Sequence, residues 1–191
     1  MNFLQRKWPL FLLGGVVINF SVVGLASAQL KALETCESCH GENVVTQVTT
    51  YPILHGQKQG YLENQLIAFR DGSRTNEVMS GIVKNLSDHE IQALAEHYSE
   101  QKFVKAGRVA SDRRGADVRA RCVSCHGLSG NTVNTEWPNL QGQNSGYILN
   151  QLNSFANGER KSVIMEQIAN ELTPEQRKLV AVYYDQQSRT E

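Results

Sequence analysis

The sequence predicts an all-α protein built from two tandem copies of one small domain. Two observations carry this prediction. The chain of 191 residues matches itself when it is shifted by 86 residues, and its periodic segments have the apolar spacing and the capping residues of helices. No convincing strand-like alternation of apolar and polar residues accompanies them. Because there are only two long copies, the repeat indicates a duplicated domain and not a solenoid.

The internal repeat runs without a gap from Cys36–Tyr98 to Cys122–Tyr184, with 24 of 63 positions identical. This identity is several times the chance level. The predicted boundaries are residues 29–105 for the first domain and 106–191 for the second, after a separate segment at residues 1–28. Domains of this size bury thin cores and often need a covalent or cofactor staple.

Helices are expected at equivalent places in both copies. Ser87 and Glu90 form a capping box ahead of one apolar stripe, and Thr173 and Gln176 do the same in the second copy. Further helices are expected over 61–69 and 147–155, each following a glycine and ending at another. Short helices over 29–39 and 116–125 lead into the cysteine motifs.

The first 28 residues have the order of an export signal: a basic start, an apolar stretch at 9–25, and Ala26-Ser27-Ala28. We predict cleavage after Ala28 and a periplasmic mature protein. The alternative is a retained anchor helix, although about 17 apolar residues lie near the lower limit for crossing a bilayer.

The charge balance argues against nucleic acid as a partner, because a nucleic-acid binder carries a basic surplus. After removal of residues 1–28 the chain keeps 17 basic and 19 acidic residues. The more acidic half is the first, with 7 basic and 10 acidic residues over 29–105.

The chemistry is expected at two Cys-x-x-Cys-His motifs, Cys36/Cys39/His40 and Cys122/Cys125/His126. A zinc knuckle would space its cysteine pairs by roughly 15–20 residues, whereas about 80 residues intervene here. A thioredoxin-like dithiol requires a βαβ unit, and a disulfide would close a small strained loop. Cys-x-x-Cys-His is also the attachment motif of c-type haem. Its repetition behind an export signal favours two covalently bound haem c groups, with His40 and His126 as iron ligands.

Methionines supply candidates for the second axial ligand of each iron. Beyond residue 28 the chain contains only Met79 and Met165, each 39 residues after its motif histidine. Methionine is often a core gap-filler, but this equivalent placement favours ligation. His/Met ligation is the cytochrome c pattern. Since it leaves no open position for a substrate, we expect an electron-transfer protein and no enzyme. We expect His55, His89 and His97 not to bind iron.

The sequence resembles the two-haem class I cytochromes of the cytochrome c4 family over nearly the whole chain after residue 28. The resemblance is carried by both Cys-x-x-Cys-His-Gly motifs, by the segments 52–57 and 138–143, by the helices at Tyr61 and Tyr147, and by Met79 and Met165. It implies two cytochrome c domains related by pseudo-two-fold symmetry, with the haem propionate edges at their interface. It also implies that the carbonyls of Pro52 and Pro138 accept hydrogen bonds from His40 and His126. Arg74 and Arg160 are candidates to pair with the propionates, because buried carboxylates need a cation or donors.

The family resemblance implies a periplasmic carrier, soluble or loosely held at the membrane, that passes electrons between respiratory complexes and terminal oxidases. A second hypothesis is the electron-accepting cytochrome subunit of a dehydrogenase, such as flavocytochrome sulfide dehydrogenase. A haem peroxidase would need a vacant axial position, and a sensor would need an output domain that 191 residues do not provide.

Overall fold

The computed structural model describes residues 21–106 and 114–189. Within these ranges the secondary structure is helical, apart from two isolated bridges, Arg74 with Arg160 and Lys105 with Arg189. The all-α prediction is therefore confirmed. The elements in chain order are α1 (Ser21–His40), α2 (Glu42–Val45), α3 (Gln59–Asp71), α4 (Glu77–Val83), α5 (Asp88–Glu100), α6 (Arg114–Val118), the 3₁₀ helix η1 (Arg119–Arg121), α7 (Val123–His126), α8 (Ser145–Ala156), α9 (Val163–Glu171) and α10 (Pro174–Asp185).

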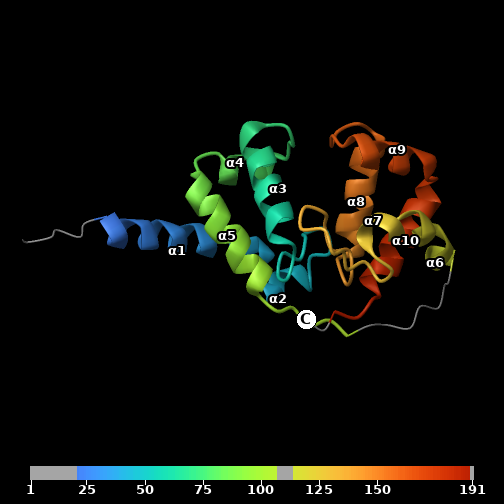
Figure 1. The fold of residues 1–191 in the computed structure, drawn as a ribbon, viewed down its shortest axis with the longest axis horizontal. Helices are drawn as coiled ribbons and strands as arrows, with labels where there is room; N and C mark the ends of the chain where they lie inside the picture. The colour runs from blue at the N-terminus through green and yellow to red at the C-terminus, as the bar shows by residue number, and fades with distance from the viewer. Residues whose placement is uncertain (1–20, 107–113, 190–191) are drawn as a thin grey trace, which may run out of the picture.

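The helices form two lobes that follow the repeat. Helices α1–α5 make the first lobe and α6–α10 the second, with α1 extending away from the rest of the molecule (Figure 1). In the first lobe α3 packs against α5, and in the second α8 packs against α10. The two pairs are equivalent in the repeat, so one packing arrangement is used twice.

Each lobe has its own small core. In the second lobe, α8, α9 and α10 supply a single cluster, whose buried members are Ile148, Leu152, Phe155, Ala169, Val180, Ala181 and Tyr184. In the first lobe the buried apolar residues fall into two smaller clusters, one of Leu62, Ala95 and Tyr98 and one of Val45, Ile53 and Phe103. Burial of such side chains contributes about 1.5–3 kcal/mol each, so cores of this size leave each lobe dependent on further stabilisation.

The predicted capping boxes are confirmed in both lobes. The Ser87 hydroxyl accepts from the Glu90 backbone N–H, and the Glu90 carboxylate accepts from the Ser87 backbone N–H. Thr173 and Gln176 make the same reciprocal pair at the start of α10. These local contacts satisfy helix N–H groups that otherwise have no partner.

The approach to the second cysteine motif differs from the expected helix over 116–125. The chain there forms three short pieces, α6, η1 and α7. α6 lies very close to α10, because a Cβ built on Gly115 would be 2.5 Å from the Leu179 carbonyl oxygen. This close packing holds the first piece against α10, and a tighter 3₁₀ turn then brings Cys122 against the core cluster. In the first lobe, by contrast, α1 is one continuous helix into the motif.

The lobes meet through reciprocal hydrogen bonds. Tyr61 N–H donates to the Thr135 carbonyl, and Tyr147 N–H donates to the Thr49 carbonyl, both at 2.9 Å. Each residue lies 86 positions from its counterpart, so the two contacts are images of one another. Reciprocity of this kind is the mark of a two-fold interface. The expected pseudo-two-fold relation between the copies is present.

The export segment and the domain boundary fall largely outside the described residues. Residues 1–20 and 107–113 are not part of the description, and Ala28 lies within α1. No helix among the described residues has the length and apolar character needed to cross a membrane. The boundaries 28/29 and 105/106 therefore stay predictions.

Candidate haem-binding site

The two cysteine motifs lie at equivalent places against the lobe cores. Cys36, Cys39 and His40 form the last turns of α1, and Cys36 packs against the cluster around Tyr98. Cys122 packs against the equivalent cluster in the second lobe. Burial raises the pKa of Cys36 to about 11, and it also raises the pKa of Cys122. Raised thiol pKa values are the opposite of the lowered values that a reactive dithiol requires.

Both motif histidines are buried and oriented by a proline carbonyl. His40 Nδ1 lies 3.1 Å from the Pro52 oxygen, and His126 Nδ1 lies 3.0 Å from the Pro138 oxygen. A carbonyl oxygen can only accept, so Nδ1 carries the hydrogen and Nε2 keeps its lone pair for a metal. Burial lowers the pKa of His40 and of His126, which favours this neutral form. The contact implied by the family resemblance is thus present in both lobes.

The two methionines occupy equivalent positions in short helices that the sequence analysis did not anticipate. Met79 is the third residue of α4 and Met165 the third residue of α9. In each case a polar N-cap side chain, Asn76 or Ser162, accepts from the methionine's own backbone N–H. The signal for these helices was the polar residue three positions before each methionine.

A cavity of about 500 Å³ brings the second set of candidate residues together. Its wall includes Cys122, Cys125, His126 and Met165. The wall also includes first-lobe residues, but Cys36, Cys39, His40 and Met79 are not among them. The structure therefore gathers the second predicted set around this cavity. The first set takes the equivalent places in the first lobe.

The residues of this cavity fit a covalently bound haem c. Two cysteine thiols lie within one turn beside a histidine whose Nδ1 faces the Pro138 carbonyl, and a thioether lines the same space. Most of the remaining wall is apolar, and its apolar members include Leu140, Ile148, Leu152, Phe155, Ile168 and Val180. Among the residues that the structure describes, no three His, Cys, Asp or Glu side chains come together as an alternative metal cluster.

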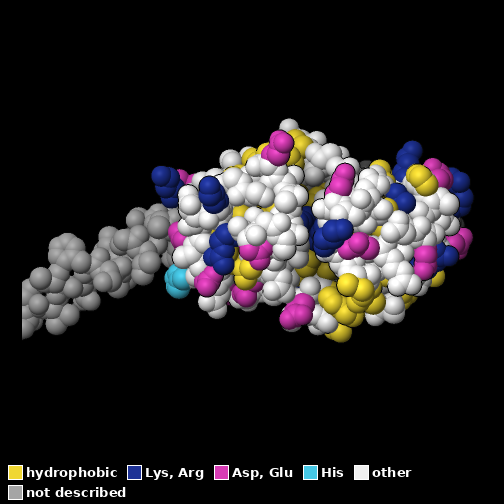
Figure 2. All heavy atoms as spheres, turned by 90° about the horizontal axis from the view of Figure 1, so that it is seen from above, with side chains coloured by type: hydrophobic (Ala, Val, Ile, Leu, Met, Phe, Trp, Pro, Cys, Tyr) yellow, Lys and Arg dark blue, Asp and Glu magenta, His cyan; other side chains and the backbone are white. Residues whose placement is uncertain are grey.

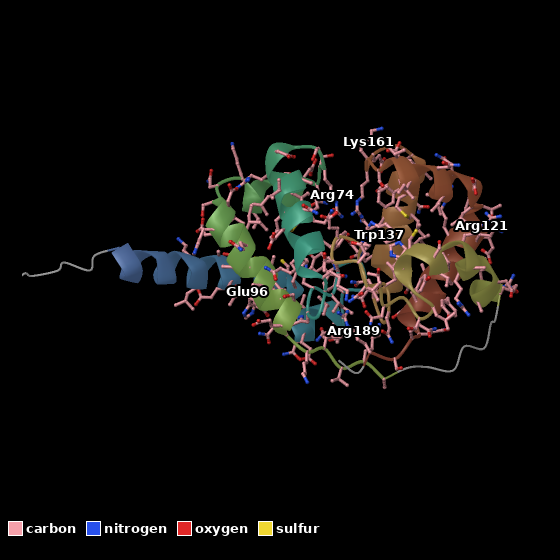
Figure 3. The ribbon with its side chains drawn as sticks, viewed as in Figure 1. Arg74, Glu96, Arg121, Trp137, Lys161 and Arg189 are labelled. Atoms are coloured by element: carbon pink, nitrogen blue, oxygen red, sulfur yellow. The ribbon has the colours of Figure 1, made fainter. Side chains whose placement is uncertain are left out.

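Two arginines enter the same cavity wall from opposite lobes. Arg74 stacks over the Phe69 ring at 4.3 Å, and Arg160 stacks over the Phe155 ring at 4.5 Å. Figure 3 shows Arg74, Trp137 and Lys161 around the space between the lobes. Seen from above, the seam carries both hydrophobic and Lys or Arg side chains (Figure 2). Pairing of these arginines with propionates stays a prediction.

The three remaining histidines have different surroundings. His89 is exposed on α5, and His97 is partly buried against Tyr98. His55 is buried, stacks on Phe103, and has its Nε2 3.9 Å from a Glu37 carboxylate oxygen. The sequence analysis did not anticipate this burial, because the second copy has Gln141 in place of His55.

Comparison with known proteins gives one family. The model of the cytochrome c family matches residues 113–187. A thiosulfate dehydrogenase electron acceptor of Stutzerimonas stutzeri is 34% identical over 80% of this chain and 79% of its own. A cytochrome c4 of Pseudomonas aeruginosa is 32% identical over 85% of this chain and 91% of its own.

Solved structures agree with these sequence relatives. The cytochrome c4 structure of Acidithiobacillus ferrooxidans is 32% identical, with a TM-score of 0.71, over 80% of this chain and 99% of that one. The reduced cytochrome c4 of Pseudomonas stutzeri has a TM-score of 0.75 at 26% identity, over 85% of this chain and 98% of that one. With two Cys-x-x-Cys-His motifs on two such lobes, the chain belongs to the cytochrome c4 family of dihaem c-type cytochromes, which carry electrons between redox proteins and are not enzymes.

Proposed function

We propose that this protein is a periplasmic carrier of single electrons between respiratory-chain partners, with one haem c attached in each lobe. Cys36 and Cys39 would hold the first haem and Cys122 and Cys125 the second. His40 and Met79 would ligate one iron, and His126 and Met165 the other. The observation that carries this proposal is the repeated contact between a motif histidine Nδ1 and a proline carbonyl, at 3.1 and 3.0 Å.

The bound haem would supply a reversible one-electron couple, and the chain would control its surroundings. The Pro52 and Pro138 carbonyls fix the tautomer and the ring orientation of His40 and His126. The largely apolar wall of the cavity, together with a thioether ligand, favours a high reduction potential. With a histidine and a methionine holding each iron, no place would remain for a substrate, and electron exchange would be the chemistry that the haem supplies.

Export would place the protein where cofactor attachment and its partners are found. Residues 1–28 have the order of a cleavable signal, with the cut proposed after Ala28. Cleavage there would leave Gln29–His40 of α1 as the helix that enters the first motif. Mass spectrometry of the mature N-terminus tests this point, because a chain that still begins at Met1 would indicate a retained anchor.

A second candidate function is the electron acceptor of a dehydrogenase for a sulfur compound. Two relatives are named thiosulfate dehydrogenase electron acceptors, one from Stutzerimonas stutzeri and one from Thiomonas intermedia at 32% identity. The chain also matches part of a thiosulfate dehydrogenase structure from Marichromatium purpuratum, at a TM-score of 0.67 and 26% identity. That match covers 80% of this chain and 36% of the other. The acceptor function would use the same two haem sites.

The decisive experiment is a reduced-minus-oxidised spectrum with a redox titration on protein matured by haem-attachment machinery. We expect two low-spin, high-potential haems. Met79→Ala and Met165→Ala should each remove the low-spin, high-potential signal of one haem and leave the other haem unchanged. His89 is an exposed histidine, so His89→Ala should change neither haem. A haem that is high-spin or binds carbon monoxide in the unaltered protein would show an open axial position and contradict the proposal.

A rapid-mixing measurement distinguishes the two candidate functions, general carrier and dehydrogenase acceptor. The oxidised protein is mixed with a purified thiosulfate dehydrogenase and thiosulfate, and reduction is followed at the haem absorption bands. Fast, saturable reduction supports the acceptor function. Reduction that is no faster than with thiosulfate alone, together with fast oxidation by a terminal oxidase, supports the general carrier.

A further inference from the structure

Arg74 and Arg160 share their hydrogen-bond acceptors across the seam between the lobes. The Gln65 side-chain oxygen accepts from Arg74 at 2.7 Å and from Arg160 at 2.8 Å. The Gln151 side-chain oxygen accepts from both guanidiniums at 2.7 Å. Each glutamine thus uses its oxygen for one arginine of its own lobe and one of the other.

Two tyrosines complete the same arrangement. Arg74 donates to the Tyr147 hydroxyl at 3.3 Å, and Arg160 donates to the Tyr61 hydroxyl at 3.0 Å. The backbones of the two arginines also pair as an isolated antiparallel bridge. The guanidiniums are therefore held side by side by a framework that belongs to neither lobe alone.

Among the residues that the structure describes, no carboxylate balances the charge of this cluster. Arg160 is buried and Arg74 partly buried, yet no carboxylate of the described residues lies within 4.0 Å of either guanidinium. All four acceptors are neutral amides or hydroxyls. Although burial opposes ionisation of the Tyr147 hydroxyl, the two arginines hold its pKa below the ordinary value. A buried pair of like charges is costly unless an anion joins it.

The cavity that contains His126 and Met165 opens onto this cluster. Arg74, Arg160 and both glutamines belong to its wall. Lys161 also lines the cavity, but its ammonium lies 3.9 Å from the Glu166 carboxylate. Haem carries two propionate carboxylates as its only anionic side groups, so the uncompensated arginines are the part of the wall that suits them.

We infer that Arg74 and Arg160 form one shared cationic bridge for the propionates of both haems, so that each arginine tunes the haem of the opposite lobe as well as its own. The inference rests on the proposed haem sites. Addition of an electron lowers the charge of a haem by one unit, and a nearby cation favours that reduced state. A cation shared by two haems raises both potentials, and its removal lowers both. Arg74 and Arg160 are positioning and tuning residues here and do not ligate iron.

The test measures each haem separately in Arg74→Gln and Arg160→Gln. Redox titration is followed by NMR, in which the shifted haem methyl signals report the oxidation state of each haem. We expect each single substitution to lower the reduction equilibrium constant of both haems, by about tenfold or about 59 mV for a one-electron couple. Arg74→Lys keeps the charge and should stay near the unaltered protein. Arg70→Gln is the matched control, because Arg70 lies at the end of α3, four residues before Arg74, but binds Leu86 O and Asp88.

Three outcomes would overturn the shared bridge. In the first, Arg74→Gln shifts only the first haem and Arg160→Gln only the second, which would assign each arginine to its own lobe. In the second, neither substitution shifts a potential beyond the Arg70→Gln control. In the third, Arg74→Lys lowers the haem potentials as much as Arg74→Gln does, which would attribute the effect to packing and not to charge. The absorption spectrum separates these results from a failure of the proposed function, since two low-spin haems must be present in every variant compared.

Discussion

The side chain of Gln57 pairs with both backbone polar groups of Asn139 in the opposite lobe. Its amide nitrogen donates to the Asn139 carbonyl at 3.0 Å, and its oxygen accepts from the Asn139 N–H at 2.7 Å. Gln143 makes the same pair of bonds to Ile53, at 2.9 and 2.8 Å. In both cases the glutamine amide bonds to the backbone N–H and C=O of one residue in the other lobe, as a neighbouring strand would.

Loss of this amide should weaken the joint between the lobes. We expect Gln57→Ala to lower the free energy of unfolding by at least about 2 kcal/mol, because a buried N–H and a buried carbonyl each lose their partner at about 1–3 kcal/mol. Chemical denaturation followed by circular dichroism measures the change. Gln92→Ala, at an exposed position of α5, serves as the control and should stay within about 0.5 kcal/mol. Equal stabilities of the two variants would refute this role.

Close backbone approach at the seam requires glycine at position 146. A Cβ built there lies 2.8 Å from the Thr49 carbonyl oxygen, which accepts the Tyr147 N–H. We expect Gly146→Ala to destabilise the protein by about 1–3 kcal/mol, since overpacking forces the backbones apart. Thermal unfolding reports the effect.

Alanine substitutions at two other glycines provide a comparison for the loss of stability at position 146. Gly60→Ala should cost less than Gly146→Ala, because its Cβ would lie 3.0 Å from the Thr135 oxygen. Gly81 lies in α4 with no heavy atom within 4 Å of a built Cβ, so Gly81→Ala should be neutral or stabilising. If Gly81→Ala were as harmful as Gly146→Ala, helix effects and not the seam would be responsible.

His55 should make the stability depend on pH. Burial lowers its pKa; Glu37 and Glu42 oppose the shift, whereas Arg189 and His97 add to it. The folded state therefore binds fewer protons than the unfolded state, and stability declines as pH falls through the unfolded pKa of about 6.5. His55→Gln, which copies Gln141, should flatten the change in unfolding free energy between pH 8 and pH 5.5. Identical slopes in urea titrations of both proteins would contradict this.

Arg189 should stabilise the contact between the end of the second lobe and the first lobe. Its guanidinium donates to the His55 carbonyl, its backbone pairs with Lys105, and burial lowers its pKa to about 10. We expect Arg189→Ala to cost about 1–3 kcal/mol, because the buried His55 carbonyl loses its donor. Arg121→Ala removes an exposed arginine whose bond to the Glu171 carbonyl is 3.4 Å long, and differential scanning calorimetry should show a smaller change. A larger loss of stability for Arg121→Ala than for Arg189→Ala would contradict this role of Arg189.

Features that depend on neighbours along the chain or on the repeat could be predicted from the sequence alone. The capping boxes at Ser87 and Thr173 need a partner only three residues away, and the Cys-x-x-Cys-His motifs place their groups within one or two helical turns. Shifting the chain by 86 residues then predicted two equivalent lobes. The family followed from these motifs, and the relatives agree with it.

The groups that meet across the seam could not be predicted in this way. Arg74 finds Gln151 77 residues later, and Arg189 finds His55 134 residues earlier. No local periodicity encodes such pairs, because they depend on how two folded lobes dock. The segment that leads into the second cysteine motif is divided into α6, η1 and α7. This division likewise reflects the packing of Gly115 against α10 and not local propensity. The repeat therefore specifies the lobes, and the contacts between the lobes specify the surroundings shared by the two proposed haem sites.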